Sequence, residues 1–382
     1  MRKTLIVTND FPPRPGGIQA FLHNMALRLE PDRFVVYAST WKRSREGVEA
    51  TAAFDAEQPF TVVRDSTTML LPTPGATRKA VALLREHGCT SVWFGAAAPL
   101  GLLAAGLRRR AGIRRAVGLT HGHEVGWAAL PGARALLRRI GRGVDTLTYL
   151  TEYQRTRLAA ALDGLTTLDR LAPGVDTDAY HPDVDGSGVR RRHGLVDRPV
   201  VVCVSRMVPR KGQDTLIHAW PLVLATTPDA TLLLVGDGPY RGRLERMARH
   251  LGVDGSVVFT GAPPRAELPG YFDAGDVFAM PCRTRRRGLD VEGLGMVFLE
   301  AAATGLPVVG GDSGNSSDAI RDGETGYVVP GVSVADLAGR LNRLLTDPCA
   351  AKAMGEKGLA WVHQEWRWEI IIHRFAEILA GE

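Results

Sequence analysis

The chain has 382 residues, of which 45% are hydrophobic and 23% are charged. This length exceeds what one hydrophobic core usually supports, so we expect two globular domains. The longest apolar run, Ala96 to Leu107, contains Pro99 and is shorter than the roughly 20 residues of a membrane-spanning helix. The N-terminus turns polar after a few apolar residues, which predicts a first strand and not a signal peptide.

The cysteines and the charged residues indicate the cellular compartment and the kinds of partner that this protein could have. The four cysteines lie far apart and lack the paired spacing of zinc or redox sites, which favours a reducing cytoplasm. The net charge is +6, and residues 1–185 hold all of the excess, with 24 Lys and Arg against 18 Asp and Glu. The clusters are Arg108–Arg110, Arg114–Arg115, Arg134, and Arg138–Arg139 with Arg142.

These arginines allow two interpretations. They form a cationic face for an anionic membrane surface, or they are an ordinary solvated surface. No aromatic residues interleave with them, so we expect no binding to nucleic acid.

Strands and helices are expected to alternate through the first half. Lys3 to Thr8 is a predicted buried strand, followed by a loop with Gly16 and Gly17 and an amphipathic helix from Phe21 to Leu29. Further strands are expected at Phe34–Ala38, Thr61–Val63, Ser91–Phe94, Ala116–Thr120 and Thr146–Thr151. The alternation predicts a parallel sheet with helices on both faces. The two glycines suit either a phosphate or sugar contact or a tight turn.

A histidine loop follows the strand expected at Ala116 to Thr120. It contains His121, His123 and Glu124. Ligands of parallel sheets bind beyond the carboxyl ends of the strands, so His121 is a candidate for substrate contact or catalysis. A histidine that only satisfies its own loop is the alternative. No metal site is predicted, because a third ligand at a suitable spacing is missing.

Residues 163 to 198 have the composition of a linker. We therefore expect an N-terminal domain of residues 1–185, completed by residues 363–382, and a C-terminal domain of residues 186–362. The segment Trp361 to Leu379 is predicted to be one amphipathic helix that returns to the first domain.

The second half repeats the strand and helix alternation. Strands are expected at Pro199–Ser205, Thr231–Val235, Val257–Thr260, Val277–Met280 and Pro307–Val309. Arg206 and Lys211 follow the first of these, on a loop stiffened by Pro209, where their charges would neutralise a leaving diphosphate. A basic turn in solvent is the alternative.

The stretch from Arg283 to Glu300 joins a cationic loop, two glycines and two carboxylates where a helix begins. Gly293 and Gly295 permit close approach of a ligand, and the amides of the helix N-terminus suit an anion. Glu292 and Glu300 suit hydroxyl groups. The stretch therefore predicts a sugar-nucleotide site, with a loop of solvated glutamates as the alternative.

Together these features resemble the retaining glycosyltransferases of family four, which have the GT-B fold. The resemblance implies an α/β protein of two Rossmann-like, doubly wound parallel-sheet domains that face a cleft, with a C-terminal helix crossing back to the first domain. Closer still, the chain resembles the phosphatidylinositol monomannoside mannosyltransferases. The residues that carry this likeness are Asn9–Pro13, Trp93–Leu100, His121–Trp127, Val208–Asp214 and Gly288–Gly295.

That family implies transfer of mannose from GDP-mannose to a phosphatidylinositol monomannoside through an α-1,6 bond, by a peripheral protein at the inner membrane face, with no cofactor required. Arg206 and Lys211 would hold the diphosphate, Glu300 the ribose, and His121 would contact the mannose near its reacting carbon. Glu292 and the amides of Gly293, Leu294, Gly295, Met296 and Val297 would hold the mannose. Gly16 and Gly17 would approach the phosphate, and Val258, Ala262 and Pro263 would edge the guanine. The candidate acceptor residues are Asn9, Asp10, Gln19, Arg64 and His123.

Two stretches depart from the family pattern. Arg285–Arg287 replace a glycine-rich run, and Gly314-Asn315-Ser316-Ser317-Asp318 replaces a Gly-Gly-x-x-Glu turn with a shorter acid. Two alternatives therefore stay open, a family-four enzyme with another nucleotide sugar and a soluble acceptor, and a nucleotide-sugar-binding protein without turnover. The sequence does not specify an oligomeric state.

Overall fold

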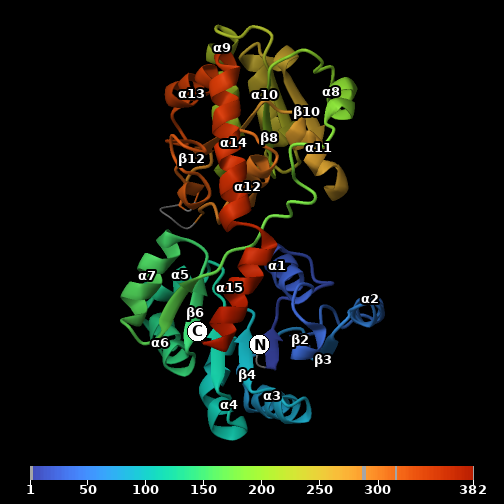
Figure 1. The fold of residues 1–382 in the computed structure, drawn as a ribbon, viewed down its shortest axis with the longest axis vertical. Coiled ribbons are helices and arrows are strands. Elements are labelled where there is room, and N and C mark those ends of the chain that lie inside the picture. Colours follow the sequence, from blue (N-terminus) through green and yellow to red (C-terminus); the bar gives the residue numbers. More distant parts are fainter. Residues whose placement is uncertain (1–2, 286–289, 315, 382) are drawn as a thin grey trace. The chain divides into compact units, whose positions relative to one another are not determined.

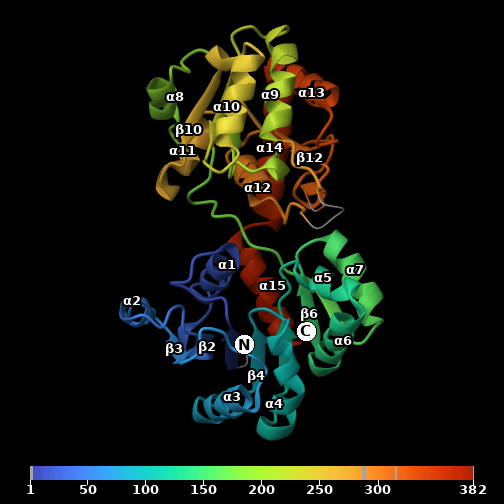
Figure 2. The same ribbon diagram turned by 180° about the vertical axis from the view of Figure 1, so that it is seen from behind.

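The structure is a computed structural model that describes residues 3–285, 290–314 and 316–381, apart from the side chain of Ser317. It divides into two compact units, Met1–Pro173 with Glu369–Glu382, and Gly174–Trp368. Each unit is a parallel sheet with helices on both faces (Figure 1 and Figure 2), which confirms the predicted fold class. Among the described residues, no helix combines the length and the apolar character needed to cross a bilayer.

The N-terminal unit contains a seven-stranded parallel sheet in the order β3-β2-β1-β4-β5-β6-β7. Its strands are β1 (Thr4–Thr8), β2 (Phe34–Ser39), β3 (Thr61–Asp65), β4 (Ser91–Phe94), β5 (Arg115–Gly118), β6 (Thr146–Tyr149) and β7 (Thr167–Arg170). Thr4 of β1 lies opposite Phe34 on one side and Ser91 on the other. All residues of β1, β2 and β4 are buried, as expected for central strands that helices cover on both faces.

The helices of this unit are α1 (Gly17–Ala26), α2 (Arg45–Ala56), α3 (Pro74–Glu86), α4 (Ala104–Ala111), α5 (Glu124–Ala129), α6 (Pro131–Gly143) and α7 (Glu152–Leu162). The side chains of Ser44, Thr73 and Thr151 cap α2, α3 and α7 by accepting from backbone amides. A core of buried side chains joins the central strands to α3, α4, α6 and α7.

The C-terminal helix α15 (Trp368–Ala380) also packs on the N-terminal sheet, on the face turned to the viewer in Figure 1. The ring of Phe375 lies 4.4 Å from that of Trp93, and Arg115 donates two hydrogen bonds, of 3.0 and 2.7 Å, to the carbonyl oxygen of Ile378. The predicted return of the last helix to the first domain is therefore confirmed.

The single helix predicted from Trp361 to Leu379 is wrong. Helix α14 (Pro348–Glu365) ends before Trp366, and α15 begins at Trp368. The break occurs because the backbone between the two helices pairs with the segment at Val175. The amide of Val175 donates to the carbonyl of Trp366 at 2.7 Å, and Val175 forms a parallel β-bridge with Arg367. The hydrophobic pattern continues across this break, so the sequence alone predicts one helix.

The division between the units falls at Pro173 and Trp368, whereas the sequence places it near residues 185 and 362. Residues 174–185 belong to the C-terminal unit because they pack there, with the Tyr180 ring 5.5 Å from that of Phe272. The linker predicted over residues 163–198 also contains β7 and helix α8 (Ser187–His193). Both elements are short and rich in polar residues, so they resemble a loop in composition.

The C-terminal unit contains a six-stranded parallel sheet in the order β10-β9-β8-β11-β12-β13. The strands are β8 (Val200–Val204), β9 (Thr231–Val235), β10 (Val257–Gly261), β11 (Val277–Met280), β12 (Val308–Gly311) and β13 (Gly326–Val329). Helices α9 (Gln213–Leu224), α10 (Arg241–His250), α11 (Leu268–Asp273), α12 (Met296–Ala303) and α13 (Val334–Thr346) complete the unit with α8 and α14.

Both sheets change winding direction beside their first strand. In the N-terminal unit this point lies between β1 and β4, and in the C-terminal unit between β8 and β11. Ligands of doubly wound sheets bind at the carboxyl ends of such strand pairs. The loops that follow these strands are therefore where a site is expected in each unit.

Candidate active site

Three loops of the C-terminal unit meet at the carboxyl ends of β8, β11 and β12. The loop after β8 carries Arg206 and Lys211, and the loop after β11 carries Glu292. The loop after β12 carries Ser313, whose hydroxyl accepts a hydrogen bond of 3.0 Å from the amide of Glu292. The sheet order thus brings predicted residues of separate segments to one edge.

Lys211 and Glu292 form a buried ion pair. The Nζ atom of Lys211 lies 2.9 Å from Oε1 and 2.9 Å from Oε2 of Glu292. Glu292 is only 5% exposed. Since a buried charge needs a close partner, the pair holds both side chains at the start of α12.

Arg210 is a site residue that the sequence reasoning missed. Its Nε atom lies 3.3 Å from Oε2 of Glu292, and its Nη1 atom lies 3.3 Å from Oδ1 of Asp290. The sequence showed only a basic turn beside Pro209. The one available signal was Asp290, a second carboxylate two positions before Glu292.

Arg206 differs from Arg210 and Lys211 because its side chain is exposed. Its carbonyl oxygen accepts from Nε2 of Gln213 at 3.1 Å, which fixes the backbone. Within the described part of the chain, its guanidinium forms no ion pair. Arg206 is therefore an available cation at the carboxyl end of β8.

Two glycines shape the start of α12. Gly295, the N-cap residue, has a φ of 74°, and a Cβ atom there would lie 2.6 Å from the ring of Phe298. A side chain at this position is therefore excluded by backbone conformation and by packing. A Cβ atom on Gly293 would meet no described atom within 4 Å, which leaves open space beside this loop. The amides of Met296 and Val297 begin the helix.

Glu300 lies one turn further along α12 and is half-buried. Burial raises the pKa of its carboxyl to about 7, against an opposing effect of the Arg265 guanidinium. Burial, followed by the charge of Glu300, also raises the pKa of Tyr180. The carboxyl therefore titrates near neutral pH in the absence of ligand.

We expect the change Glu300→Gln to stabilise the protein more at pH 8 than at pH 5. Between its ordinary value of 4.5 and the folded value of about 7, the folded chain binds a proton that the unfolded chain releases. Stability is therefore lost as the pH rises through this interval, by at most about 3 kcal/mol. Thermal unfolding of both proteins at the two pH values measures the difference. An equal shift at pH 5 and pH 8 would contradict the raised pKa.

The residues predicted to edge the guanine lie on the outer strand of the sheet. Val258 is part of β10, and Ala262 and Pro263 follow it at the carboxyl end. Ala262 is exposed, while Val258 and Pro263 are half-buried. Their contact with a base stays a prediction.

In the N-terminal unit, His121 follows β5 and its Nε2 atom lies 2.6 Å from the carbonyl oxygen of Gly95, just after β4. A carbonyl only accepts, so Nε2 carries the hydrogen. Burial lowers the pKa of His121, which favours the neutral ring with Nδ1 as an acceptor. The amide of His121 donates to Oε2 of Glu124 at 3.0 Å, which fixes the loop.

The loop after β1 and the first turn of α1 contain five predicted residues, which are Asn9, Asp10, Gly16, Gly17 and Gln19. Nε2 of Gln19 donates to Oδ1 of Asp10 at 2.7 Å. Gly16 has a φ of 156°, and a Cβ atom on it would collide with the Gln19 side chain. A Cβ atom on Gly17 would meet no described atom within 4 Å, so the start of α1 is open beside it.

The remaining predicted acceptor residues make internal contacts. Asn9 exchanges two hydrogen bonds with the backbone of Leu70, of 3.0 and 2.6 Å. Arg64 pairs with Asp55 at 2.7 Å and donates to the carbonyl oxygens of Ser39 and Pro12. Nε2 of His123 lies 3.1 Å from Oε1 of Glu124. These contacts shape the loops, and acceptor binding by these residues stays a prediction.

The two departures from the family pattern are described only in part. Arg285 forms a backbone bridge with Asp290, and its Nη1 atom lies 3.7 Å from Oδ2 of Asp290. Residues 286–289 and Asn315 lie outside the described residues. Asp318 belongs to the short 3-10 helix Ser316–Ala319. In the described ranges, no three His, Cys, Asp or Glu side chains are grouped as metal ligands.

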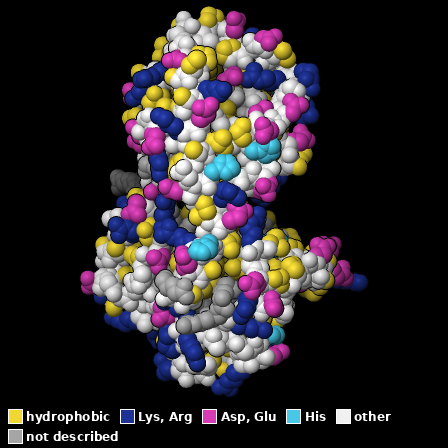
Figure 3. Space-filling view, viewed as in Figure 1, with side chains coloured by type: hydrophobic (Ala, Val, Ile, Leu, Met, Phe, Trp, Pro, Cys, Tyr) yellow, Lys and Arg dark blue, Asp and Glu magenta, His cyan; other side chains and the backbone are white. Residues whose placement is uncertain are grey.

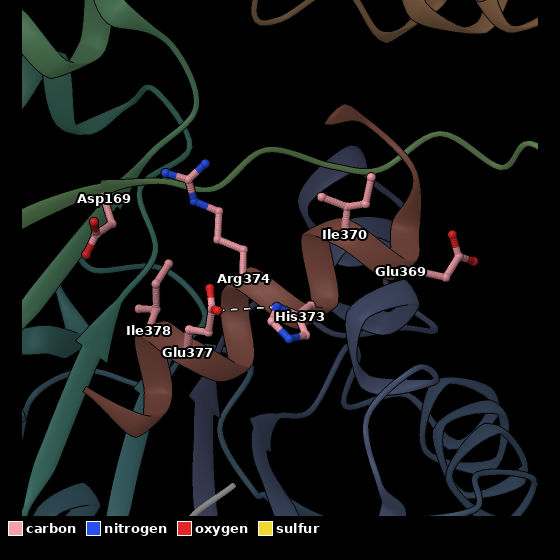
Figure 4. A pocket seen from close by; sticks show the side chains of 7 residues that line it. All are labelled: Asp169, Glu369, Ile370, His373, Arg374, Glu377 and Ile378. Carbon is pink, nitrogen blue, oxygen red and sulfur yellow. Dashed lines mark ion pairs between the residues drawn. The ribbon is translucent and has the colours of Figure 1, made fainter. Parts of the chain in front are cut away.

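A cavity of about 570 Å³ lies elsewhere in the N-terminal unit, beside α15. Figure 4 shows Arg374, Glu377 and Ile378 of α15 on the side of Asp169 in β7. Nδ1 of His373 lies 3.4 Å from Oε1 of Glu377, and the His373 side chain is 78% exposed. The cavity holds none of the predicted site residues and mixes charges of both signs, so we do not assign it to the donor.

Known proteins match this chain along its whole length. Residues 189–361 match the family of glycosyl transferases group 1. A GDP-mannose-dependent α-(1-6)-phosphatidylinositol monomannoside mannosyltransferase of Mycolicibacterium smegmatis is 50% identical over 379 residues, which cover 99% of this chain and 98% of that protein. This chain belongs to the phosphatidylinositol monomannoside mannosyltransferase family.

A second member of the phosphatidylinositol monomannoside mannosyltransferase family is similar throughout. The Corynebacterium glutamicum enzyme, named for a monoacylated acceptor, is 45% identical over 384 residues, covering 100% of this chain and 98% of that protein. Among solved structures, Anabaena HepE in complex with UDP matches with a TM-score of 0.78 at 22% identity, over all of both chains. The family predicted from the sequence motifs is therefore confirmed.

Proposed function

We propose that this chain transfers mannose from GDP-mannose to a phosphatidylinositol monomannoside, with an α-1,6 bond and retained anomeric configuration. The observation that carries the proposal is the buried pair of Lys211 and Glu292 at the start of α12, in a chain 50% identical to a GDP-mannose-dependent enzyme. Cations and carboxylates beside a helix N-terminus suit a donor that carries both a diphosphate and hydroxyl groups.

In this proposal the C-terminal unit binds the donor. Arg206 and Lys211 neutralise the diphosphate, and the first amides of α12 add partial positive charge. Glu292 accepts from mannose hydroxyls, with the backbone of residues 293–297, and Glu300 accepts from the ribose. Val258, Ala262 and Pro263 flank the guanine. The places of Arg206 and Lys211 after β8, of Ala262 and Pro263 after β10, and of Glu292 after β11 support these roles.

The proposed N-terminal contributions rest on the family likeness and on local geometry. Gly17 offers an open approach for the donor phosphate, with Gly16 fixing the turn before it. His121 contacts the mannose near its reacting carbon. Asn9, Asp10, Gln19, Arg64 and His123 are the proposed acceptor residues.

The chemistry requires stabilisation of the leaving group above all. The bond between the mannose anomeric carbon and the phosphate oxygen breaks, the acceptor hydroxyl attacks from the same face, and its proton passes to the departing phosphate. Arg206 and Lys211 stabilise the negative charge that develops on the GDP, so the proposed mechanism needs no cofactor. Glu292 acts as a binding group and not as a covalent nucleophile. A trapped glycosyl adduct on Glu292 would contradict this role.

We also propose that the N-terminal unit docks on the inner face of the cell membrane through its arginines. On α6, Arg139 and Arg142 are exposed together with Leu136, which is 42% exposed, and Leu130 just before the helix is 64% exposed. Figure 3 shows Lys and Arg side chains over this unit, with acidic side chains between them. Exposed leucines beside arginines suit an anionic bilayer surface.

Reversing two of these charges, Arg139→Glu with Arg142→Glu, should weaken binding to anionic liposomes by at least about 10-fold, since each arginine contributes about 1 kcal/mol near such a surface. Arg138 is left in place because its guanidinium donates to the carbonyl of Ala161 at 2.8 Å. Liposome co-sedimentation measures the effect.

The matched control is Arg246→Glu with Arg249→Glu, the same charge change at two exposed positions of α10. It should bind liposomes like the unchanged protein. Equal binding by the α6 variant would contradict docking through α6. No liposome binding by the unchanged protein would favour a soluble acceptor.

The test of the proposed function is a panel of nucleotide sugars offered with a phosphatidylinositol monomannoside acceptor. We expect transfer from GDP-mannose and a product with an α-1,6 linkage. Transfer only from another donor, or only to a soluble acceptor, would select the alternative glycosyltransferase. Binding of GDP-mannose without any product would select a binding protein.

A further inference from the structure

Among the described residues, two cations are in contact with Glu292, and only one of the two has a place in the proposed chemistry. Lys211 lies 2.9 Å from both carboxylate oxygens, and Nε of Arg210 lies 3.3 Å from Oε2. The Nε–H group of Arg210 is buried and makes no hydrogen bond with any described residue. A small rotation of the guanidinium would complete a hydrogen bond to Glu292.

The far end of Arg210 is anchored. Its Nη1 atom lies 3.3 Å from Oδ1 of Asp290, which Arg285 holds by a backbone bridge with hydrogen bonds of 2.8 and 3.2 Å. The carbonyl of Arg210 also accepts from the amide of Arg283 at 2.9 Å. Arg210 therefore connects the loop after β8 to the loop after β11 through both backbone and side chain.

Lys211 can move away from Glu292 more easily than Arg210 can. A bound diphosphate attracts Lys211, and a lysine that turns to the phosphate can no longer hold both carboxylate oxygens of Glu292. Glu292 would then lack its main partner while only 5% exposed, which is costly for a carboxylate. Arg210 has its own carboxylate anchor and a planar fork suited to bridging Asp290 and Glu292.

We propose that Arg210, anchored by Asp290, is a positioning residue that holds the Glu292 carboxylate against the donor sugar while Lys211 turns to the diphosphate. This inference rests on the proposed function. Arg210 acts through Glu292, so its loss affects recognition of the sugar and not of the diphosphate.

The change Arg210→Ala should therefore lower kcat for sugar transfer by about 100-fold, the order expected when a substrate is misplaced by about 1 Å. The dissociation constant of GDP should stay within about threefold, while that of GDP-mannose rises. Arg210→Lys should recover part of the loss, because a lysine pairs with one carboxylate but does not bridge two. Calorimetric titration with GDP and GDP-mannose, alongside initial rates, measures all of these.

Two further variants separate positioning from folding. In the Glu292→Gln background, Arg210→Ala should add little further loss, because the charge it holds is gone. Arg190→Ala is the matched control, since Arg190 also pairs with a carboxylate, Asp276 at 2.9 Å, but on α8 at the amino ends of the strands. This control should keep the kinetics of the unchanged protein.

Equal losses for GDP and GDP-mannose in Arg210→Ala would make Arg210 a phosphate ligand and overturn the inference. Full additivity with Glu292→Gln would also overturn it. UDP and UDP-glucose are titrated in parallel. The unchanged protein could show no turnover of GDP-mannose, and Arg210→Ala could weaken the binding of UDP-glucose but not of UDP. That result would support the inference about Arg210 and contradict the proposed function. Binding of neither pair by the unchanged protein would overturn both.

Discussion

Alanine in place of Lys211 should reduce mannosyl transfer from GDP-mannose by about 100- to 1000-fold, the usual cost of removing one preorganised donor to a developing charge. Lys211 is largely buried, with a side chain that is 12% exposed, and it lies at the carboxyl end of β8, where the diphosphate is proposed to bind. The loss should appear in kcat and in kcat/KM, because the charge on the leaving GDP develops in the transition state. Steady-state rates with a phosphatidylinositol monomannoside acceptor measure it.

Arg206→Ala is the companion variant and should lose activity on the same scale. It should leave the free energy of unfolding within about 0.5 kcal/mol, because Arg206 is exposed and forms no ion pair with the described residues. Activity within a few-fold of the unchanged protein in both variants would remove the two cations from the mechanism.

The second large effect concerns stability. Lys211→Ala should lower the free energy of unfolding by about 2 kcal/mol, because the buried Glu292 loses the cation that lies 2.9 Å from both of its oxygens and keeps Arg210 at 3.3 Å. Adding Glu292→Gln should restore most of this stability, since the buried charge that has lost Lys211 is removed, while activity stays lost. Chemical denaturation of the single and double variants measures the recovery.

A surface ion pair provides the control for this experiment. Lys352 lies 4.0 Å from Glu356 on α14, and its side chain is 79% exposed. Lys352→Ala should change the free energy of unfolding by less than about 1 kcal/mol. If Lys211→Ala were equally mild, the ion pair of Lys211 and Glu292 would be exposed to water in solution and not buried.

Short apolar runs in the sequence correctly predicted most strands of the two sheets. The strands predicted at Ser91–Phe94, Thr231–Val235 and Val277–Met280 have the observed bounds, because short apolar runs between turn residues specify central strands of a parallel sheet. Strand β7, with the sequence Thr-Leu-Asp-Arg, carried no such pattern and escaped prediction because it has a single apolar residue. Strand β13 was also missed, although Tyr327 to Val329 is a short apolar run of the same kind.

The break between α14 and α15 shows a different limit. The hydrophobic pattern from Trp361 to Leu379 is compatible with one helix, and no proline or glycine interrupts it. The helix ends because Val175, far away in the chain, bonds to Trp366. Long-range pairing of this kind leaves no local signal in the helix that it interrupts.

At the site, the sequence by itself determined which residue types stand at the ends of the strands. Cations after β8, glycines before α12 and carboxylates around them follow from local chemistry, and the family likeness assigned their roles. Only the tertiary structure decided which charges meet: Lys211 and Glu292 lie 81 positions apart, and the sheet order brings them within 2.9 Å. It also gave Arg210 two carboxylate partners, because parallel strands align loops whose separation in the chain carries no information about pairing.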